Sequence, residues 1–203
     1  EAARDMYRQE TGTEFPMPLP YRWMRSDAPA ELGQHIVETL AGDVREMPEV
    51  LLRLGQSTHA ESPRLYERLR GLLPREMQEF WRHYDEPDAV PRPQRAEGLH
   101  LVREAFVRHA DTAQTERFLR IVVSYGVEEL RIAADAYMAA GRHAAARAAW
   151  ELCAQQGGAE ALYGAGLCAM RMGDADAGRE YLMQALATAP AHRKARELME
   201  WIG

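Results

Sequence analysis

Hydrophobic residues recur every three to four positions along most of this chain, with polar residues between them. That spacing puts the apolar side chains on one face of an α-helix, whereas a strand would need strict alternation. Proline and glycine separate the amphipathic segments from one another. The pattern predicts an all-α chain with almost no strand, and in the first half it predicts helices over 2–9, 28–41, 48–54, 75–84 and one opened by Ser62 and Pro63.

Two proline-rich segments interrupt the helical pattern. The alternating prolines of 15–20 fix φ and favour extended backbone at each preceding residue, and their spacing is not that of a PxxP motif. We expect this arm to pack on the protein's own surface. Residues 85–98 hold three prolines and little that can be buried, which is typical of a linker. The chain therefore divides into a helical N-terminal region with an extended arm (1–84), a linker (85–98) and a second domain (99–203).

The second domain opens with a predicted hairpin of helices over 99–108 and 111–125. Asp111 is followed three residues later by Gln114, the spacing of a capping box, in which two side chains bond backbone N–H groups at the start of a helix. We interpret this hairpin as a degenerate copy of the two clearer hairpins that follow it, since its small residues are spaced less regularly.

Small residues recur in the last part of the chain where two helices of a hairpin must touch. In 159–190 the small residues and the turn glycine are Gly166, Ala169, Gly178, Ala185 and Gly173. Helices approach closely only where side chains are small, and the helical period puts Gly166 and Ala169 opposite Leu182. An earlier hairpin, 127–158, has its turn glycine, Gly141, 32 residues before Gly173.

These two hairpins resemble the tetratricopeptide repeat, whose copies of about 34 residues stack into a solenoid with a protein-binding groove. The matching residues are Leu130, Ala134, Tyr137, Gly141, Ala146, Trp150 and Cys153 in the first hairpin and Leu162, Gly166, Ala169, Gly178, Leu182, Ala185 and Pro190 in the second. The chain departs from the family pattern where Gly178 stands in a helix interior. The resemblance implies a short helical-hairpin solenoid that ends in a polar-faced capping helix over 191–202, with Leu198, Trp201 and Ile202 facing inward.

The resemblance also implies a binding site, because the first helix of each repeat in this family lines a concave surface that holds a partner. Carried over to this chain, the partner-binding groove consists of Arg131, Asp135, Met138, Glu160, Tyr163, Leu167, Met170 and Arg171. Methionine adapts to irregular apolar shapes, and the two arginines would border the apolar floor. We expect an apolar helix or extended peptide of another protein, with an acidic group nearby, to bind there. The alternative is that the N-terminal region folds back and fills the groove.

Charge, apolar runs and cysteine usage narrow the possible partners and the location. The formal net charge is −6 without a basic stripe, so nucleic-acid binding is disfavoured. No apolar run approaches the roughly 20 residues of a membrane span, so membrane insertion is not expected. The two cysteines, Cys153 and Cys168, lie in predicted packed helices and are interpreted as small buried hydrophobes, which suits a reducing, cytoplasmic location. Because the sequence starts at Glu1 rather than Met, a further segment before Glu1 is compatible with it.

The sequence offers little catalytic chemistry. None of the seven histidines lies three or four residues from another, so a helical zinc pair is absent. Glu79 and His83 share a helix face and are interpreted as an ordinary surface pair. The acidic cluster of Asp85, Glu86 and Asp88 is interpreted as solvated, and neither a glycine-rich phosphate loop nor a nucleophile elbow is present. We therefore expect no enzyme activity, no catalytic residue, no metal and no cofactor.

The sequence thus favours a non-enzymatic interaction module, an adaptor or chaperone that binds another protein. Small chaperones of type III secretion are similar in having few repeats and a groove that bears methionine. Arginine far outnumbers lysine, which favours a bacterial source, so a bacterial protein-secretion or assembly system is the expected setting.

Two alternatives come from different classes of function. The first is a small-ligand-sensing or catalytic helical domain at 1–84, with the repeats as a regulatory attachment. The aromatic residues that could line a pocket there are interpreted as core instead; they are Tyr21, Trp23, Tyr66, Trp81 and Tyr84. The second alternative is a homo-oligomer in which the repeats of two copies pack together.

Overall fold

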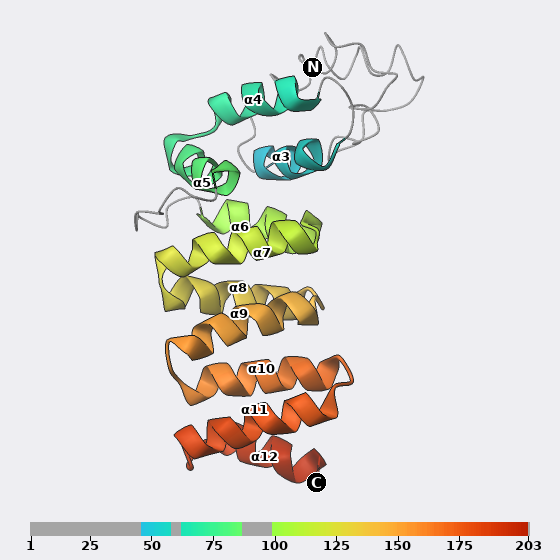
Figure 1. Cartoon of the computed structure of the whole chain (residues 1–203), viewed down its shortest axis with the longest axis vertical. Coiled ribbons are helices and arrows are strands. Elements are labelled where there is room, and N and C mark those ends of the chain that lie inside the picture. Colours follow the sequence, from blue (N-terminus) through green and yellow to red (C-terminus); the bar gives the residue numbers. More distant parts are fainter. Residues whose placement is uncertain (1–45, 58–61, 87–98, 203) are drawn as a thin grey trace. The chain divides into compact units, whose positions relative to one another are not determined.

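The computed structural model describes residues 46–57, 62–86 and 99–202 (Figure 1). All regular structure in these residues is helical, which confirms the predicted all-α class. The helices predicted before residue 46, the proline-rich arm and residues 87–98 of the predicted linker lie outside the described residues. The described helices form two compact units, the first within 46–110 and the second within 111–202.

The first unit contains α3 (Met47–Gln56), α4 (Ser62–Leu72), α5 (Arg75–Asp85) and α6 (Leu99–His109). α3 packs against α4 and α6, and α5 packs against the same two helices. The helices predicted over 48–54, 75–84 and 99–108 are thereby confirmed with small differences at their ends. Pro48 stands in the first turn of α3, where its fixed φ suits the helix and its missing N–H is not needed.

Aromatic side chains of α5 and α6 form the centre of the first unit. The ring centroid of Trp81 lies 5.1 Å from that of Tyr84 and 5.8 Å from that of Phe106. All three side chains are buried, and Tyr66 meets the Trp81 ring edge-on from α4. The interpretation of Trp81 and Tyr84 as core is confirmed, whereas the predicted core aromatics before residue 46 lie outside the described residues.

α6 packs with the helices that precede the predicted linker. The sequence places this helix in the domain 99–203, but its contacts in the structure group it with α3 and α5. The side chains of Val102 and Phe106 are fully buried, and His109 Nε2 lies 3.1 Å from Glu49 Oε2 of α3. The apolar face of α6 therefore completes the core of the first unit.

The second unit contains α7 (Thr112–Val122), the 3₁₀ turn η2 (Val123–Tyr125), α8 (Val127–Ala139), α9 (His143–Gln155), α10 (Ala159–Arg171), α11 (Ala175–Thr188) and α12 (Arg193–Ile202). From α8 onward each helix packs against the next one in the chain. The hairpins α8–α9 and α10–α11 follow one another, and α12 covers the last of them (Figure 1). Gly141 and Gly173 make the two hairpin turns with φ of 72° and 84°, a conformation that glycine adopts readily.

Helix caps fix where the helices of this unit begin. The predicted capping box is confirmed at the start of α7, where the Gln114 N–H donates to Asp111 Oδ1 at 2.8 Å and the Asp111 N–H donates to Gln114 Oε1 at 3.1 Å. Asp174 caps α11 by accepting the Ala177 N–H at 3.1 Å. Each cap satisfies backbone donors that the helix itself leaves open.

Two glycines, which have no side chain, allow α10 and α11 to pack close together. A Cβ added at Gly166 would lie 3.2 Å from both the Gly178 carbonyl oxygen and Leu182 Cγ, so the predicted approach of Gly166 to Leu182 is confirmed. A Cβ at Gly178 would lie 2.6 Å from Met170 Sδ. The Gly178 departure from the repeat pattern therefore has a structural reason, because Met170 fills the space that a side chain would take.

The capping helix α12 differs from the prediction at one position. Trp201 is 80% exposed, so the prediction that it faces inward is wrong. Leu198 and Ile202 do pack against the apolar cluster that contains Leu182, as predicted. Consecutive helical residues are separated by about 100°, which turns Trp201 away from the face that Leu198 and Ile202 share.

Candidate functional site

Three of the predicted groove residues lie on α8. Arg131 and Asp135 are exposed, and Met138 is half-buried. The Arg131 guanidinium donates to both carboxylate oxygens of Glu128, at 2.6 and 3.1 Å. This hydrogen-bonded pairing raises the pKa of Arg131 and lowers the pKa of Glu128. The charge of Arg131 is therefore already matched within its own helix.

Two more predicted groove residues, Glu160 and Tyr163, lie in the first turns of α10 and are contacted by the start of α12. His192 Nε2 lies 2.9 Å from Glu160 Oε2, and Lys194 Nζ donates to Glu160 Oε1 at 3.2 Å. The Tyr163 ring centroid is 5.3 Å from the His192 ring and 5.8 Å from Lys194 Nζ. Burial acts to raise the pKa of Glu160, but the hydrogen bonds from Lys194 and His192 lower it. The first turn of α12 thus covers this end of the predicted groove.

The structure brings the α8 and α10 residues near one another. The Cys168 thiol of α10 lies 3.2 Å from Met138 Sδ of α8, so the two helices are in contact. The carboxylates of Asp135 and Glu160 both help to raise the pKa of Arg131, which places all three charges in one region. Leu167 is half-buried in the middle of α10.

The last two predicted groove residues lie apart from the others. Met170 packs against α11, where its sulfur occupies the space beside Gly178. Arg171 is exposed at the end of α10 and lines a hollow formed with α7 and α9. The structure therefore gathers Arg131, Asp135 and Glu160 in one region and directs Met170 and Arg171 elsewhere. Leu167 shares the α10 face of Glu160 and Tyr163 by the helical period.

Sequence reasoning missed the hollow between α7 and α9, which has a volume of about 580 Å³. Its lining residues are Thr112, Thr115, Glu116, Leu119, Gly141, Arg142, His143, Ala144, Ala145, Ala148, Arg171 and Met172. They come from α7, the α8–α9 turn, α9 and the end of α10, and no spacing along the chain predicts that these segments meet. One local signal exists: Arg142 follows the turn glycine of α8–α9, whereas the capping residue Asp174 follows that of α10–α11.

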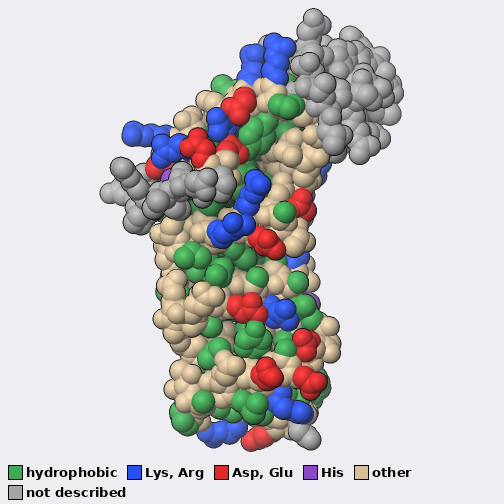
Figure 2. All heavy atoms as spheres, in the orientation of Figure 1, with side chains coloured by type: hydrophobic (Ala, Val, Ile, Leu, Met, Phe, Trp, Pro, Cys, Tyr) green, Lys and Arg blue, Asp and Glu red, His purple; other side chains and the backbone are tan. Residues whose placement is uncertain are grey.

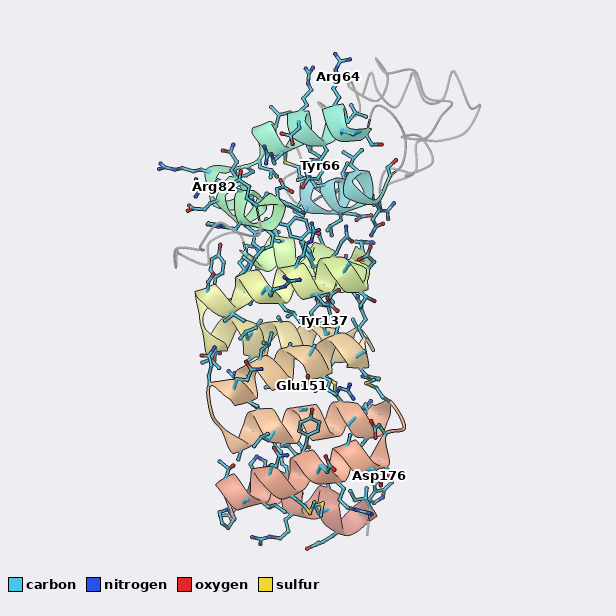
Figure 3. All side chains as sticks on the ribbon, in the orientation of Figure 1. Arg64, Tyr66, Arg82, Tyr137, Glu151 and Asp176 are labelled. Carbon is cyan, nitrogen blue, oxygen red and sulfur yellow. The ribbon has the colours of Figure 1, made fainter. Side chains whose placement is uncertain are left out.

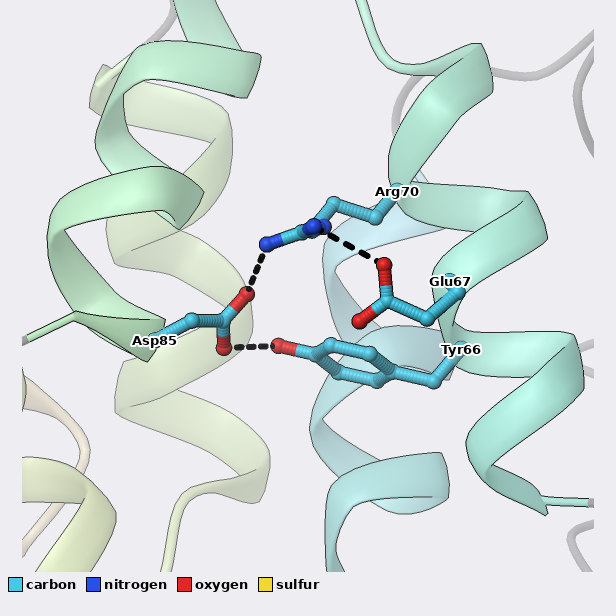
Figure 4. A network of polar contacts seen from close by, with 4 residues as sticks. All are labelled: Tyr66, Glu67, Arg70 and Asp85. Carbon is cyan, nitrogen blue, oxygen red and sulfur yellow. Dashed lines mark hydrogen bonds and ion pairs between the residues drawn. The ribbon is translucent and has the colours of Figure 1, made fainter.

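A second polar cluster, in the first unit, joins α4 to the end of α5 (Figure 4). The Tyr66 hydroxyl donates to Asp85 Oδ1 at 2.6 Å, and Arg70 Nη1 donates to Asp85 Oδ2 at 2.9 Å. Arg70 also donates to Glu67 at 2.8 Å. Burial and the bond to Asp85 raise the pKa of Tyr66. The interpretation of Asp85 as a solvated linker residue is wrong, because both of its oxygens hold α4 in place.

His83 is also placed differently from the sequence interpretation. Its side chain is buried, whereas Glu79 lies near the surface and pairs with Arg82 at 3.3 Å. The interpretation of Glu79 and His83 as a surface pair is therefore wrong. His83 is 6% exposed, so the first unit buries it although it lies about 100° from Tyr84 around the helix. Within the described residues, no group of three or more histidine, cysteine or acidic side chains could hold a metal ion.

The second unit holds both cysteines inside its helix contacts. Cys153 and Cys168 are free and buried, which confirms their interpretation as small buried residues. Burial raises the pKa of each thiol to about 11. Tyr137 is fully buried in the same unit (Figure 3), and burial raises its pKa to about 12. These groups stay protonated at neutral pH and act as packing residues.

Neither the family models nor the curated proteins compared with this chain contain a match to it. In the described part of the chain, no helix is both long and apolar enough to span a membrane. On the face shown in Figure 2, acidic and basic side chains are interspersed over the second unit. The functional interpretation therefore depends on the geometry of the chain itself.

Proposed function

We propose that the second unit is a protein-interaction module, an adaptor or chaperone that binds a segment of another protein on the surface formed by α8 and α10. The observation that supports this proposal is the stacking of the hairpins α8–α9 and α10–α11, in which α9 packs against α10. Their first helices, α8 and α10, are also in contact, because the sulfur atoms of Met138 and Cys168 lie 3.2 Å apart. Stacked hairpins of this kind create extended surfaces that hold partner segments. The likeness to tetratricopeptide repeats points to the same use.

The charged side chains of this surface favour a partner segment that contains a lysine or arginine. The expectation of an acidic partner group rested on Arg131 and Arg171, but Glu128 holds Arg131, and Arg171 lines the separate hollow. Asp135 makes no hydrogen bond or ion pair with any described residue, although its charge acts on the nearby Arg131. We therefore propose a partner segment that packs an apolar residue against Leu167 and places lysine or arginine beside Asp135.

The start of α12 limits how much of the surface is open. His192 and Lys194 already lie on Glu160 and Tyr163, so the open part extends from Arg131 to Leu167. Lys194 lies beside the Glu160 carboxylate and 5.8 Å from the Tyr163 ring, which is the kind of contact that we propose for a partner cation at Asp135.

A bacterial secretion or assembly system is the setting that we propose for this module. The support is the likeness to small secretion chaperones and the preference for arginine over lysine in the composition. In such a setting, the open surface would shield one apolar, cationic segment of a client protein before assembly.

A peptide-display selection against the full chain tests the proposed partner chemistry. Leu167→Glu puts a charge into the apolar part of the surface, and Asp135→Asn removes its open carboxylate. Arg193→Gln is the matched control, because Arg193 is 86% exposed on α12 and pairs only with Glu197 within the described chain. We expect enriched peptides to combine apolar residues with lysine or arginine and to bind Leu167→Glu about tenfold more weakly or worse.

The control should bind these peptides as the natural chain does, and Asp135→Asn should weaken the cationic peptides selectively. A selection without enrichment, or peptides that bind Leu167→Glu and the natural chain equally, would remove the proposed surface.

A further inference from the structure

The hollow between α7 and α9 lies outside the proposed partner-binding surface. α7 forms one wall, the first turns of α9 form the other, and the end of α10 closes one side with Arg171 and Met172. Its volume of about 580 Å³ falls within the range of roughly 300–1,000 Å³ that is typical of small-ligand sites. A small molecule would therefore fit in the hollow, and the residues that line it determine which chemical class of molecule would bind.

The interior of the hollow is apolar. Leu119 is buried beneath it, and Ala145 and Ala148 of α9 are small enough to leave space above themselves. Met172 is 43% exposed beside it, where its flexible thioether can adapt to an apolar ligand. An aliphatic group would therefore be removed from water on several sides.

The charged groups of the lining are two guanidiniums, Arg142 and Arg171, and one carboxylate, Glu116. Arg142 donates to the Thr115 hydroxyl at 3.0 Å and lies over the Tyr137 ring, 5.2 Å from its centroid, so it is held within the second unit. Arg171 makes no hydrogen bond or ion pair with any described residue, so its donors are available. The Arg171 guanidinium therefore complements a ligand with one negative charge.

The start of α9 adds backbone donors to the same region. No side chain caps this helix, since Arg142 stands at the capping position. The N–H groups of Ala144 and Ala145 lie in the first turn, where the helix dipole also favours an anion.

We propose that this hollow binds a small monoanion with an apolar body, such as a medium-chain carboxylate. The apolar body packs on Leu119, Ala145 and Ala148, and the carboxylate lies between the Arg171 guanidinium and the first turn of α9. The site is independent of the surface on α8 and α10, so either proposal can fail without the other.

Titration of the full chain with octanoate tests the proposal, with binding followed by calorimetry and by backbone amide NMR shifts. Octylamine has the same body with the opposite charge, and acetate has the same charge without the body. We expect saturable octanoate binding that shifts the amides of Ala144 and Ala145, and no comparable binding of octylamine or acetate. Absence of saturable octanoate binding, or equal binding of octylamine, would overturn the proposal.

Variants with opposite expected effects on octanoate affinity test whether octanoate binds in this hollow. Arg171→Gln removes the available guanidinium and should weaken octanoate about tenfold, whereas Glu116→Gln removes the repelling carboxylate and should tighten it. Ala148→Leu fills the hollow and should also weaken binding, and Arg193→Gln is the control for loss of a remote surface charge. Arg171 and Glu116 are exposed, so both variants are expected to keep the natural melting temperature. Octanoate affinity unchanged by Arg171→Gln, with unchanged melting, would place any binding elsewhere and refute the site.

Discussion

Individual glycines determine how closely the helices of the second unit pack. The ring of Trp150 from α9 lies directly over Gly164 of α10, and a Cβ at Gly164 would meet its atoms at 2.5 to 2.9 Å. The resemblance identifies Trp150 as a packed residue, but sequence reasoning singled out Gly166 and not Gly164. Spacing within one hairpin predicts Gly166, whereas the contact at Gly164 joins two hairpins and depends on their stacking.

Gly164→Ala should destabilise the protein by about 1–3 kcal/mol, because the indole ring has to move to admit the methyl group. Gly71→Ala is the matched control: Gly71 lies in α4 with nothing within 4 Å of the added Cβ. That change should stabilise its helix by about 0.5–1 kcal/mol. Urea unfolding followed by circular dichroism measures both, and equal effects of the two variants would show that the Trp150 contact is not tight.

The two buried thiols also predict, at the scale of single residues, how the stability of the fold depends on pH. Burial raises the pKa of Cys153 and Cys168 from 9.0 to about 11, so the folded protein holds these protons more tightly than the unfolded chain does. Their contribution to stability is present below about pH 9 and is lost as the pH rises toward about 11. At pH 9 we expect slow alkylation of both cysteines in the folded protein and rapid alkylation in urea. Rapid labelling of the folded protein at pH 9 would contradict their burial.

At the scale of helices, local signals were the most dependable part of the sequence. The Asp111 and Gln114 box could be predicted because both partners lie within one turn. Side chains that bond across helices could not be predicted: Asp85 reaches α4 over 15 residues or more, and His192 reaches Glu160 over 32. The sequence shows that α12 is amphipathic, but packing against α11 determines which residues form its buried face. For this reason Trp201 was wrongly predicted to face inward.

His192 holds α12 in two ways, and variants can separate them. Its Nδ1 accepts the Ala195 N–H at 3.1 Å as the cap of α12, and its Nε2 faces Glu160. His192→Ala loses both contacts, whereas His192→Asn keeps a capping oxygen. We expect amide exchange in 193–202 to speed up about tenfold in His192→Ala and less in His192→Asn. Equal exchange in the natural chain and His192→Ala would show that this residue does not anchor α12.

At the scale of the whole molecule, the sequence predicts a division of the chain, but it assigns α6 to the second domain, whereas the contacts of α6 group it with the first unit. The apolar face of α6 is visible in the sequence, whereas the surface that covers it is set by long-range packing against α3 and α5. The same limit applies to the candidate sites. Repeat spacing predicts residues on α8 and α10, but the hollow between α7 and α9 exists only because separate helices meet.

The grouping of α6 leads to a prediction about fragments. Residues 111–203 should fold alone and unfold cooperatively, because their helix contacts are internal to the second unit. A fragment of 99–203 should instead expose the buried side chains of Val102 and Phe106 and self-associate. Analytical ultracentrifugation compares the two fragments, and a monomeric 99–203 with additional cooperative stability would assign α6 to the second unit.

Affinity capture from the native cell extract tests most directly whether the α8 and α10 surface binds a protein partner. The full chain is compared with a Leu167→Glu and Asp135→Asn double variant and with the Arg193→Gln control, all with matched melting temperatures. We predict that at least one protein is retained by the natural chain and the control and is lost from the double variant. Retention of the same proteins by all three, or of none by the natural chain, would contradict partner binding at this surface.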